Sequence, residues 1–122
     1  MKILLLGFEG MLGGELYSLF KKDHQVTGKD IRDFDITSLT ECRRVVEENH
    51  PAVVINAVAY TDVDGCESNS DGCFAVNAEG IKNVALACRG KNIQIVHFGT
   101  DYVFDGRKND PYCEGDECCP IN

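Results

Sequence analysis

The opening of the chain constrains its fold more than any other stretch. "KILLLG" (2–7) is an uninterrupted apolar run, which is typical of a strand buried on both faces. Leu12, Leu16, Leu19 and Phe20 follow at a spacing that places them on one face of a helix. A buried strand that leads directly into an apolar-faced helix predicts an α/β fold with a parallel sheet.

The rest of the chain repeats this alternation. Further strands are predicted at "HQVTG" (24–28), "AVVINAVA" (52–59) and "IQIVHF" (93–98). Between them, "SLTE" (38–41) predicts a capping box at a helix start, and the segment 74–88 carries an apolar helical face. Right-handed crossovers then predict a partial Rossmann-like, doubly wound sheet of about four parallel strands in the order 3-2-1-4. The polar, turn-rich remainder is predicted to be a loop.

Size, charge and cysteines narrow the class of protein. The chain of 122 residues suits one domain, 1–122. A net charge of −8 argues against nucleic-acid or membrane partners, because both attract clustered Lys and Arg. No apolar stretch approaches the roughly 20 residues of a membrane span. The seven cysteines form no C-x-x-C pair and favour free thiols in a reducing cytoplasm.

A glycine triplet joins the first strand to the first helix. In "GFEGMLGGEL", Gly7 permits a tight turn, Gly10 lets the backbone approach a pyrophosphate, and Gly13 lets the helix pack closely on the strand. The free amides at the start of the helix would face the phosphates. The triplet therefore predicts a dinucleotide site, and the alternative is a tight turn with no ligand.

An acidic residue follows at the end of the second predicted strand. Asp30 stands where a carboxylate can bond the ribose 2′-hydroxyl, which favours NADH. Lys29 and Arg32 flank it, and either could meet the 2′-phosphate of NADPH. The choice between NADPH and NADH stays open, and all three residues could instead belong to a solvated turn.

Five motifs together resemble a known family. They are "GFEGMLG" (7–13), "DIT" (35–37), "INAVAYTDVDGCE" (55–67), "VNAEG" (76–80) and "HFGTDYVFDG" (97–106). In this order they are similar to dTDP-4-dehydrorhamnose reductase, an extended short-chain dehydrogenase/reductase, over nearly the whole chain. The resemblance implies NAD(P)H-dependent reduction of dTDP-4-dehydro-L-rhamnose to dTDP-L-rhamnose, a dTDP-sugar substrate and a homodimer. One departure is Gly99, which stands where the family usually has Ser.

The resemblance also implies roles for individual residues. Those on the cofactor side are Gly7, Gly10, Met11, Leu12, Gly13, Asp30, Asp35, Ile36, Ala57, Ala59, Tyr60 and Thr61. Those on the substrate side are Val63, Thr100, Asp101 and Tyr102, and the Thr100 hydroxyl would also support catalysis. Glu15 is a candidate magnesium ligand at a dimer interface, the alternative being an exposed helical glutamate. From their own positions rather than from the resemblance, Asn77 is expected to be a buried residue that ties down backbone, the alternative being a catalytic role. His97 is expected to lie in the core or at its rim, the alternative being a general base.

The proton donor of the family is missing from this sequence. The family uses Tyr-x-x-x-Lys, and no such motif follows Thr100 before the final "PIN". We therefore expect an N-terminal portion, truncated before the catalytic helix and inactive alone. Two alternatives are another nucleotide-sugar epimerase or dehydratase of the superfamily, and a non-catalytic dinucleotide-binding or regulatory module.

Overall fold

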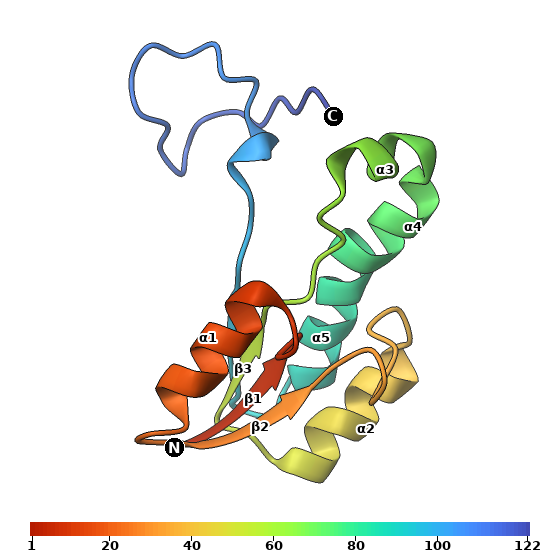
Figure 1. Cartoon of the computed structure of the whole chain (residues 1–122), viewed down its shortest axis with the longest axis vertical. Helices are drawn as coiled ribbons and strands as arrows, with labels where there is room; N and C mark the ends of the chain where they lie inside the picture. The colour runs from red at the N-terminus through yellow and green to blue at the C-terminus, as the bar shows by residue number, and fades with distance from the viewer.

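The protein forms three layers, with a parallel sheet between two layers of helices (Figure 1). The structure, a computed structural model, describes residues 1–122. Helix α1 (Met11–Phe20) covers one face of the sheet, and α2 (Leu39–Asn49) and α5 (Ile81–Cys88) cover the other. The strands are β1 (Lys2–Leu6), β2 (Gln25–Lys29), β3 (Val53–Asn56) and β4 (Gln94–His97). The predicted α/β fold with a parallel sheet is confirmed.

Alternation along the central strands builds a core on each face of the sheet. Leu4, Leu6 and Val54 belong to the larger buried cluster, with residues of α2 and α5. Their neighbours Leu5 and Ile55 belong to the smaller cluster beneath α1. Successive side chains of a strand point to opposite faces, so a strand covered on both faces must be apolar throughout.

The predicted strand order 3-2-1-4 is wrong. The observed order is β2-β1-β3-β4, because β3 pairs with β1 rather than with β2. The sequence "QVTGK" of β2 is more polar and less buried than "VVIN" of β3, so β2 suits the edge and β3 the interior. The chain reverses its direction across the sheet after β2, and a crevice therefore forms between β1 and β3.

Helix α1 forms where predicted, and its predicted apolar face is buried in part, since Leu16 and Phe20 pack on the core. Leu12 and Leu19 are exposed, whereas Gly13 is buried. Gly13 packs against the glycine loop at Gly7. The helix therefore turns the side of Tyr17 toward the sheet and leaves Leu12 and Leu19 exposed. The side chains of α1 that pack on the small core are Leu16, Tyr17 and Phe20.

The capping box of α2 forms only in part. The Ser38 hydroxyl accepts a hydrogen bond from the Glu41 amide at 3.4 Å, as predicted. The Glu41 carboxylate does not turn back to Ser38 but accepts from the Asp35 amide at 2.8 Å. The helix start is thereby tied to the loop that follows β2.

The third helical region is longer than predicted. Two short helices, α3 (Val63–Ser68) and α4 (Ser70–Phe74), precede a π-helix, η1 (Ala75–Gly80), that runs on into α5. Side chains start both short helices: Asp62 accepts from the Gly65 amide and Asn69 from the Gly72 amide. These capping acids and amides break the apolar periodicity on which the prediction relied.

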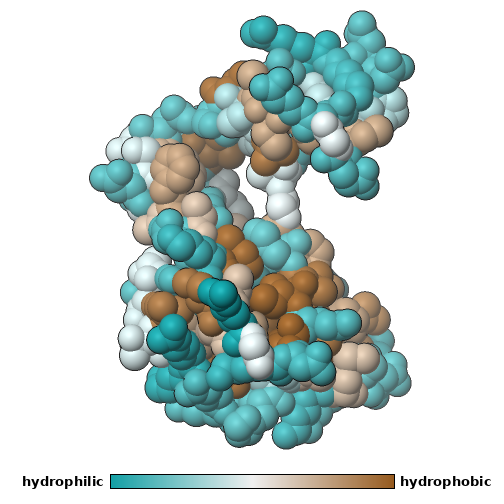
Figure 2. Space-filling model, turned by 180° about the vertical axis from the view of Figure 1, so that it is seen from behind, coloured by the Kyte–Doolittle hydropathy of each residue, from teal (hydrophilic) through white to brown (hydrophobic).

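The segment after β4 extends away from the sheet. It contains one 3-10 turn, η2 (Asp101–Val103), and otherwise the predicted loop. Figure 2 shows this C-terminal part joined to the body by a narrow neck, with a hollow between them. Strand β4 itself is exposed along its length. No helix anywhere in the molecule is long and apolar enough to cross a membrane.

Candidate functional site

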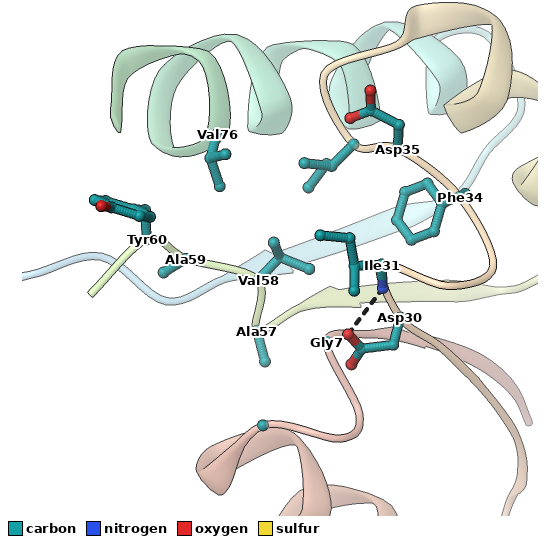
Figure 3. A pocket seen from close by; sticks show the side chains of 12 residues that line it. Gly7, Asp30, Ile31, Phe34, Asp35, Ala57, Val58, Ala59, Tyr60 and Val76 are labelled. Atoms are coloured by element: carbon teal, nitrogen blue, oxygen red, sulfur yellow. Dashed lines mark hydrogen bonds between the residues drawn. The ribbon is translucent and has the colours of Figure 1, made fainter. Parts of the chain in front are cut away.

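A cavity of about 320 Å3 opens where β1, β2 and β3 end (Figure 3). It lies at the reversal of strand order, where open α/β sheets bind their ligands. Figure 3 shows Ile31, Val58 and Val76 converging on it from separate segments, with Tyr60 at one end. The residues that line it are Gly7, Gly10, Asp30, Ile31, Phe34, Asp35, Ile36, Ala57, Val58, Ala59, Tyr60 and Val76.

The glycine loop is held by close backbone contacts. Gly7 has φ of +79°, and a Cβ there would lie 2.9 Å from the Ala57 carbonyl carbon. A Cβ on Gly13 would lie 1.9 Å from the Gly7 oxygen. Both positions therefore require glycine for the turn and for the packing of α1 on β1. A Cβ on Gly10 would lie 3.3 Å from the Gly7 oxygen, so the loop itself demands glycine least at this position.

The N-terminus of α1 is free to bind an anion. Gly10 is the N-cap, and no side chain accepts a hydrogen bond from the first-turn amides. The first amides of a helix have no partner within it and carry its partial positive charge. Since Gly10 also lines the cavity, these donors stand at its edge.

Asp30 joins the glycine loop to the end of β2. One carboxylate oxygen accepts from the Glu9 amide at 3.0 Å, and the other from the Ile31 amide at 2.8 Å. The adjacent cations are paired with acids, Lys29 with Asp33 at 3.6 Å and Arg32 with Glu9. The Asp30 amide, followed by Lys29, lowers the pKa of the Asp33 carboxyl against a smaller opposing effect of burial.

Two asparagines fix the backbone of the cavity wall that follows β3. Asn77, in η1, accepts from the Tyr60 amide at 2.8 Å and donates to the Tyr60 carbonyl at 3.0 Å. Asn56 is 2% exposed and accepts from the Val58 amide at 3.2 Å. Its amide nitrogen lies 3.1 Å from His97 Nδ1. The expectation that Asn77 ties down backbone is confirmed, although Asn77 is exposed and His97 lies outside the core.

The cavity gathers most of the predicted cofactor-side residues. Those at its surface are Gly7, Gly10, Asp30, Asp35, Ile36, Ala57, Ala59 and Tyr60. Gly13 is buried beneath the loop, and the residues exposed outside the lining are Met11, Leu12 and Thr61. Sequence reasoning missed Ile31, Phe34, Val58 and Val76. Val58 could have been predicted, because it lies between the predicted residues Ala57 and Ala59 at the end of a strand. Phe34 could not, because it lies in a loop with no periodic pattern.

Three of the four predicted substrate-side residues lie at a second cavity of about 510 Å3. Val63, Asp101 and Tyr102 line it together with residues of the C-terminal segment. Thr100 is exposed and is not part of the lining; its hydroxyl accepts from the Tyr102 amide at 3.1 Å and so caps η2. Glu15 is exposed on α1, and no cluster of three or more His, Cys, Asp or Glu side chains could hold a metal ion.

Comparison with known proteins places the chain in a family. The model of the RmlD substrate binding domain matches residues 1–122. The chain belongs to the RmlD family. A dTDP-4-dehydrorhamnose reductase from Burkholderia thailandensis is 40% identical over 122 residues, covering 100% of this chain. The chain spans 41% of the length of that RmlD-family relative.

Solved structures agree with this placement. A dTDP-4-dehydrorhamnose reductase from Clostridium acetobutylicum is 42% identical with a TM-score of 0.93, covering 98% of this chain and 43% of its own. The Bacillus anthracis enzyme, solved in complex with NADP, is 34% identical with a TM-score of 0.94, covering 99% and 43%. These RmlD-family structures confirm the Rossmann-like fold.

Proposed function

We propose that this chain is the dinucleotide-binding portion of an NAD(P)H-dependent reductase that converts dTDP-4-dehydro-L-rhamnose to dTDP-L-rhamnose. One observation carries the proposal: the glycine loop, the α1 N-terminus and Asp30 meet at a cavity on the reversal of strand order. The names of the relatives and the NADP complex of the Bacillus anthracis structure support it.

Different residues around the cavity would contact different parts of the dinucleotide. Gly10, Met11 and Leu12 would line the pyrophosphate. The Met11 and Leu12 amides are free first-turn donors at a positive helix end, whereas the Gly10 amide donates to the Gly7 carbonyl at 3.1 Å. Asp30 would accept from the adenosine ribose, with Asp35 and Ile36 beside the adenine. Ala59, Tyr60 and Thr61 would border the nicotinamide. The bound cofactor supplies the hydride for ketone reduction.

The second cavity suits the sugar nucleotide. Val63 of α3 lies there together with Asp101 and Tyr102 of η2, and Thr100 is the N-cap of η2. We propose Thr100 as the hydroxyl that hydrogen bonds the substrate ketone and the proton-donating tyrosine of the complete enzyme. Since no Tyr-x-x-x-Lys follows Thr100, we expect the 122 residues alone to bind cofactor without turnover. The cytoplasmic location, the homodimer and the magnesium site at Glu15 remain predictions.

Titration of NADPH and NADH into the chain tests the proposal. Gly10→Val should weaken binding of both by about tenfold or more, since a branched side chain would occupy the phosphate position. Gly115→Val is the matched control, because a Cβ there meets nothing within 4 Å. Calorimetry measures the affinities, and circular dichroism checks that each variant folds. Equal affinities for Gly10→Val and the wild type would mean that the loop is only a turn.

A further inference from the structure

The loop that follows β2 is tied to helix α5 by one buried side chain. Phe34 and Ile36 of this loop line the cavity and are 4% and 6% exposed. Asn83 on α5 is 8% exposed, and its amide nitrogen donates to the Ile36 carbonyl at 3.2 Å and to the Thr37 carbonyl at 2.9 Å. A side-chain amide carries two N–H donors, so Asn83 can serve both carbonyls at once.

The other side-chain hydrogen bonds of the loop 34–37 run within the loop or to α2. The Glu41 carboxylate accepts from the Asp35 amide at 2.8 Å, and the Cys42 thiol donates to the Ile36 carbonyl at 3.4 Å. Both of these partners lie on α2. The side-chain hydrogen bonds between the loop and α5 are therefore those of Asn83, which fix how far the loop lies from that helix.

The same continuous helix holds the cavity wall that follows β3. The π-helix η1 runs on into α5, and Asn77 in η1 binds both the amide and the carbonyl of Tyr60. Val76 lines the cavity between these two attachment points. Figure 3 shows the helix passing across the cavity from Tyr60 toward the loop that carries Asp35. One helix thus holds both walls, through Asn77 on one side and Asn83 on the other.

Close packing reinforces the contact between α5 and the loop. A Cβ on Gly80, just before α5, would lie 3.1 Å from Ile36 Cγ2. Ile36 also belongs to the large core, with Val84 of α5. Without the Asn83 amide, the half-buried Thr37 carbonyl loses this donor, and a polar group so deprived gains by moving toward water. The loop would then shift away from α5 and widen the cavity on its side.

We propose that Asn83 is a positioning residue for the adenine half of the dinucleotide, as Asn77 is for the nicotinamide half. The assignment rests on the proposed function, which puts the adenine beside the loop 34–37 and the nicotinamide beside Tyr60. Because each wall has its own asparagine, removal of the Asn83 amide moves the adenine wall and leaves Tyr60 held. Its effect is therefore confined to one half of the ligand.

Two ligands that differ in the nicotinamide test this assignment. ADP-ribose carries the adenine half of NADH but no nicotinamide, and calorimetry gives the affinity of each ligand. Asn83→Leu keeps the size of the side chain and removes its donors, so both affinities should fall about fivefold or more, the equivalent of one hydrogen bond. Asn77→Leu should weaken NADH by a similar factor and leave ADP-ribose unchanged.

Asn49→Leu is the matched control. The Asn49 amide donates to the Val45 carbonyl at 2.7 Å within α2, and neither residue lines the cavity, so both affinities should hold. Unchanged ADP-ribose affinity in Asn83→Leu, or equal loss of ADP-ribose affinity in Asn83→Leu and Asn77→Leu, overturns the assignment. A wild-type chain that binds neither ligand overturns the proposed function and the assignment with it, so the wild type alone separates the two failures.

NMR of the wild-type chain decides the question even if Asn83→Leu does not fold. ADP-ribose should shift the side-chain amide signals of Asn83, which is bonded to the loop beside the adenine, and leave those of Asn77 in place. NADH should shift both sets. Shifts at Asn77 without shifts at Asn83 on addition of ADP-ribose would show that the adenine half does not bind against this loop, and so overturn the assignment.

Discussion

At the scale of the residue, Gly13 is the tightest position in the site. A Cβ on Gly13 would lie 1.9 Å from the Gly7 oxygen, whereas one on the adjacent Gly14 would lie 3.7 Å from the Phe8 oxygen. Gly13→Ala must therefore shift backbone, and we expect a loss of about 1–3 kcal/mol in the free energy of unfolding. Gly14→Ala should gain about 0.5–1 kcal/mol from helix propensity. Urea unfolding of both variants measures the contrast, and equal stabilities would refute it.

Glu9 controls the charge beside Asp30, where we propose that the adenosine ribose binds. Its carboxylate pairs with Arg32, and its amide donates to Asp30. Glu9→Gln keeps the amide but frees the guanidinium to meet a 2′-phosphate, so the ratio of NADPH to NADH affinity should rise severalfold. Charge-assisted hydrogen bonds to phosphate favour Arg in this role. Glu15→Gln on the exposed face of α1 is the control for loss of charge alone. An unchanged affinity ratio in Glu9→Gln would place Arg32 outside the ribose site.

At the scale of the element, local sequence patterns predicted where the strands and helices lie better than they predicted which strands pair in the sheet. The apolar run at 2–7 and the glycines at 7 and 13 gave β1, the turn and the start of α1, because these depend on local sterics. The pairing of β3 with β1 depends on burial across the whole sheet, which no local period reports. Polar residues in β2 were the one signal that it lies at an edge.

In the site, too, the residues set by local geometry could be predicted and those set by the tertiary fold could not. Asp30 could be placed from its distance to the glycines, since the βαβ unit fixes that geometry. Phe34 and Val76 reach the cavity only through the path of a loop and the widened turn of a π-helix. Neither path leaves a periodic trace in the sequence, so these residues could not be predicted.

The C-terminal segment is an element held by side-chain hydrogen bonds. The Asp105 carboxylate accepts from the Arg107 amide at 3.0 Å and from the Tyr112 hydroxyl at 3.1 Å, and Tyr112 stacks on Phe104 at 4.1 Å between centroids. The Arg107 amide, ahead of Tyr112 and the Arg107 charge, lowers the pKa of the Asp105 carboxyl below its usual 3.8, and a smaller effect of burial opposes it.

A lowered pKa fixes the direction of the pH dependence. The stabilisation by Asp105 is fully present above pH 3.8 and is lost as the pH falls through the lower, folded-state pKa. We therefore expect the stack of Phe104 and Tyr112 to persist at neutral pH and to loosen in acid below 3.8. Ring-current shifts of Tyr112 in NMR spectra report this change. Asp105→Asn should loosen the stack at neutral pH, whereas Asp110→Asn, whose carboxylate makes no hydrogen bond in the structure, should not.

At the scale of the whole molecule, the neck between body and C-terminal part sets where a protease cuts. Arg107 and Lys108 lie in the exposed segment beyond the neck, whereas Arg43 and Arg44 lie within the helix α2. Trypsin should cut at Arg107 and Lys108 at least tenfold faster, because cleavage requires local unfolding that costs little in a loop. Mass spectrometry of a time course gives the two rates. Comparable rates would mean that the body opens as readily as the segment.

The π-helix η1 carries a consequence for insertions and deletions. A π-turn accommodates one residue more than an α-turn, and η1 joins α4 to α5 without a break. Deleting one residue from 75–80 would let the three elements run as a single α-helix. The residues before the deletion would then rotate by about 100° relative to α5, the angle of one helical residue. The helical register set by η1, more than any single side chain in it, therefore keeps Asn77 opposite Tyr60.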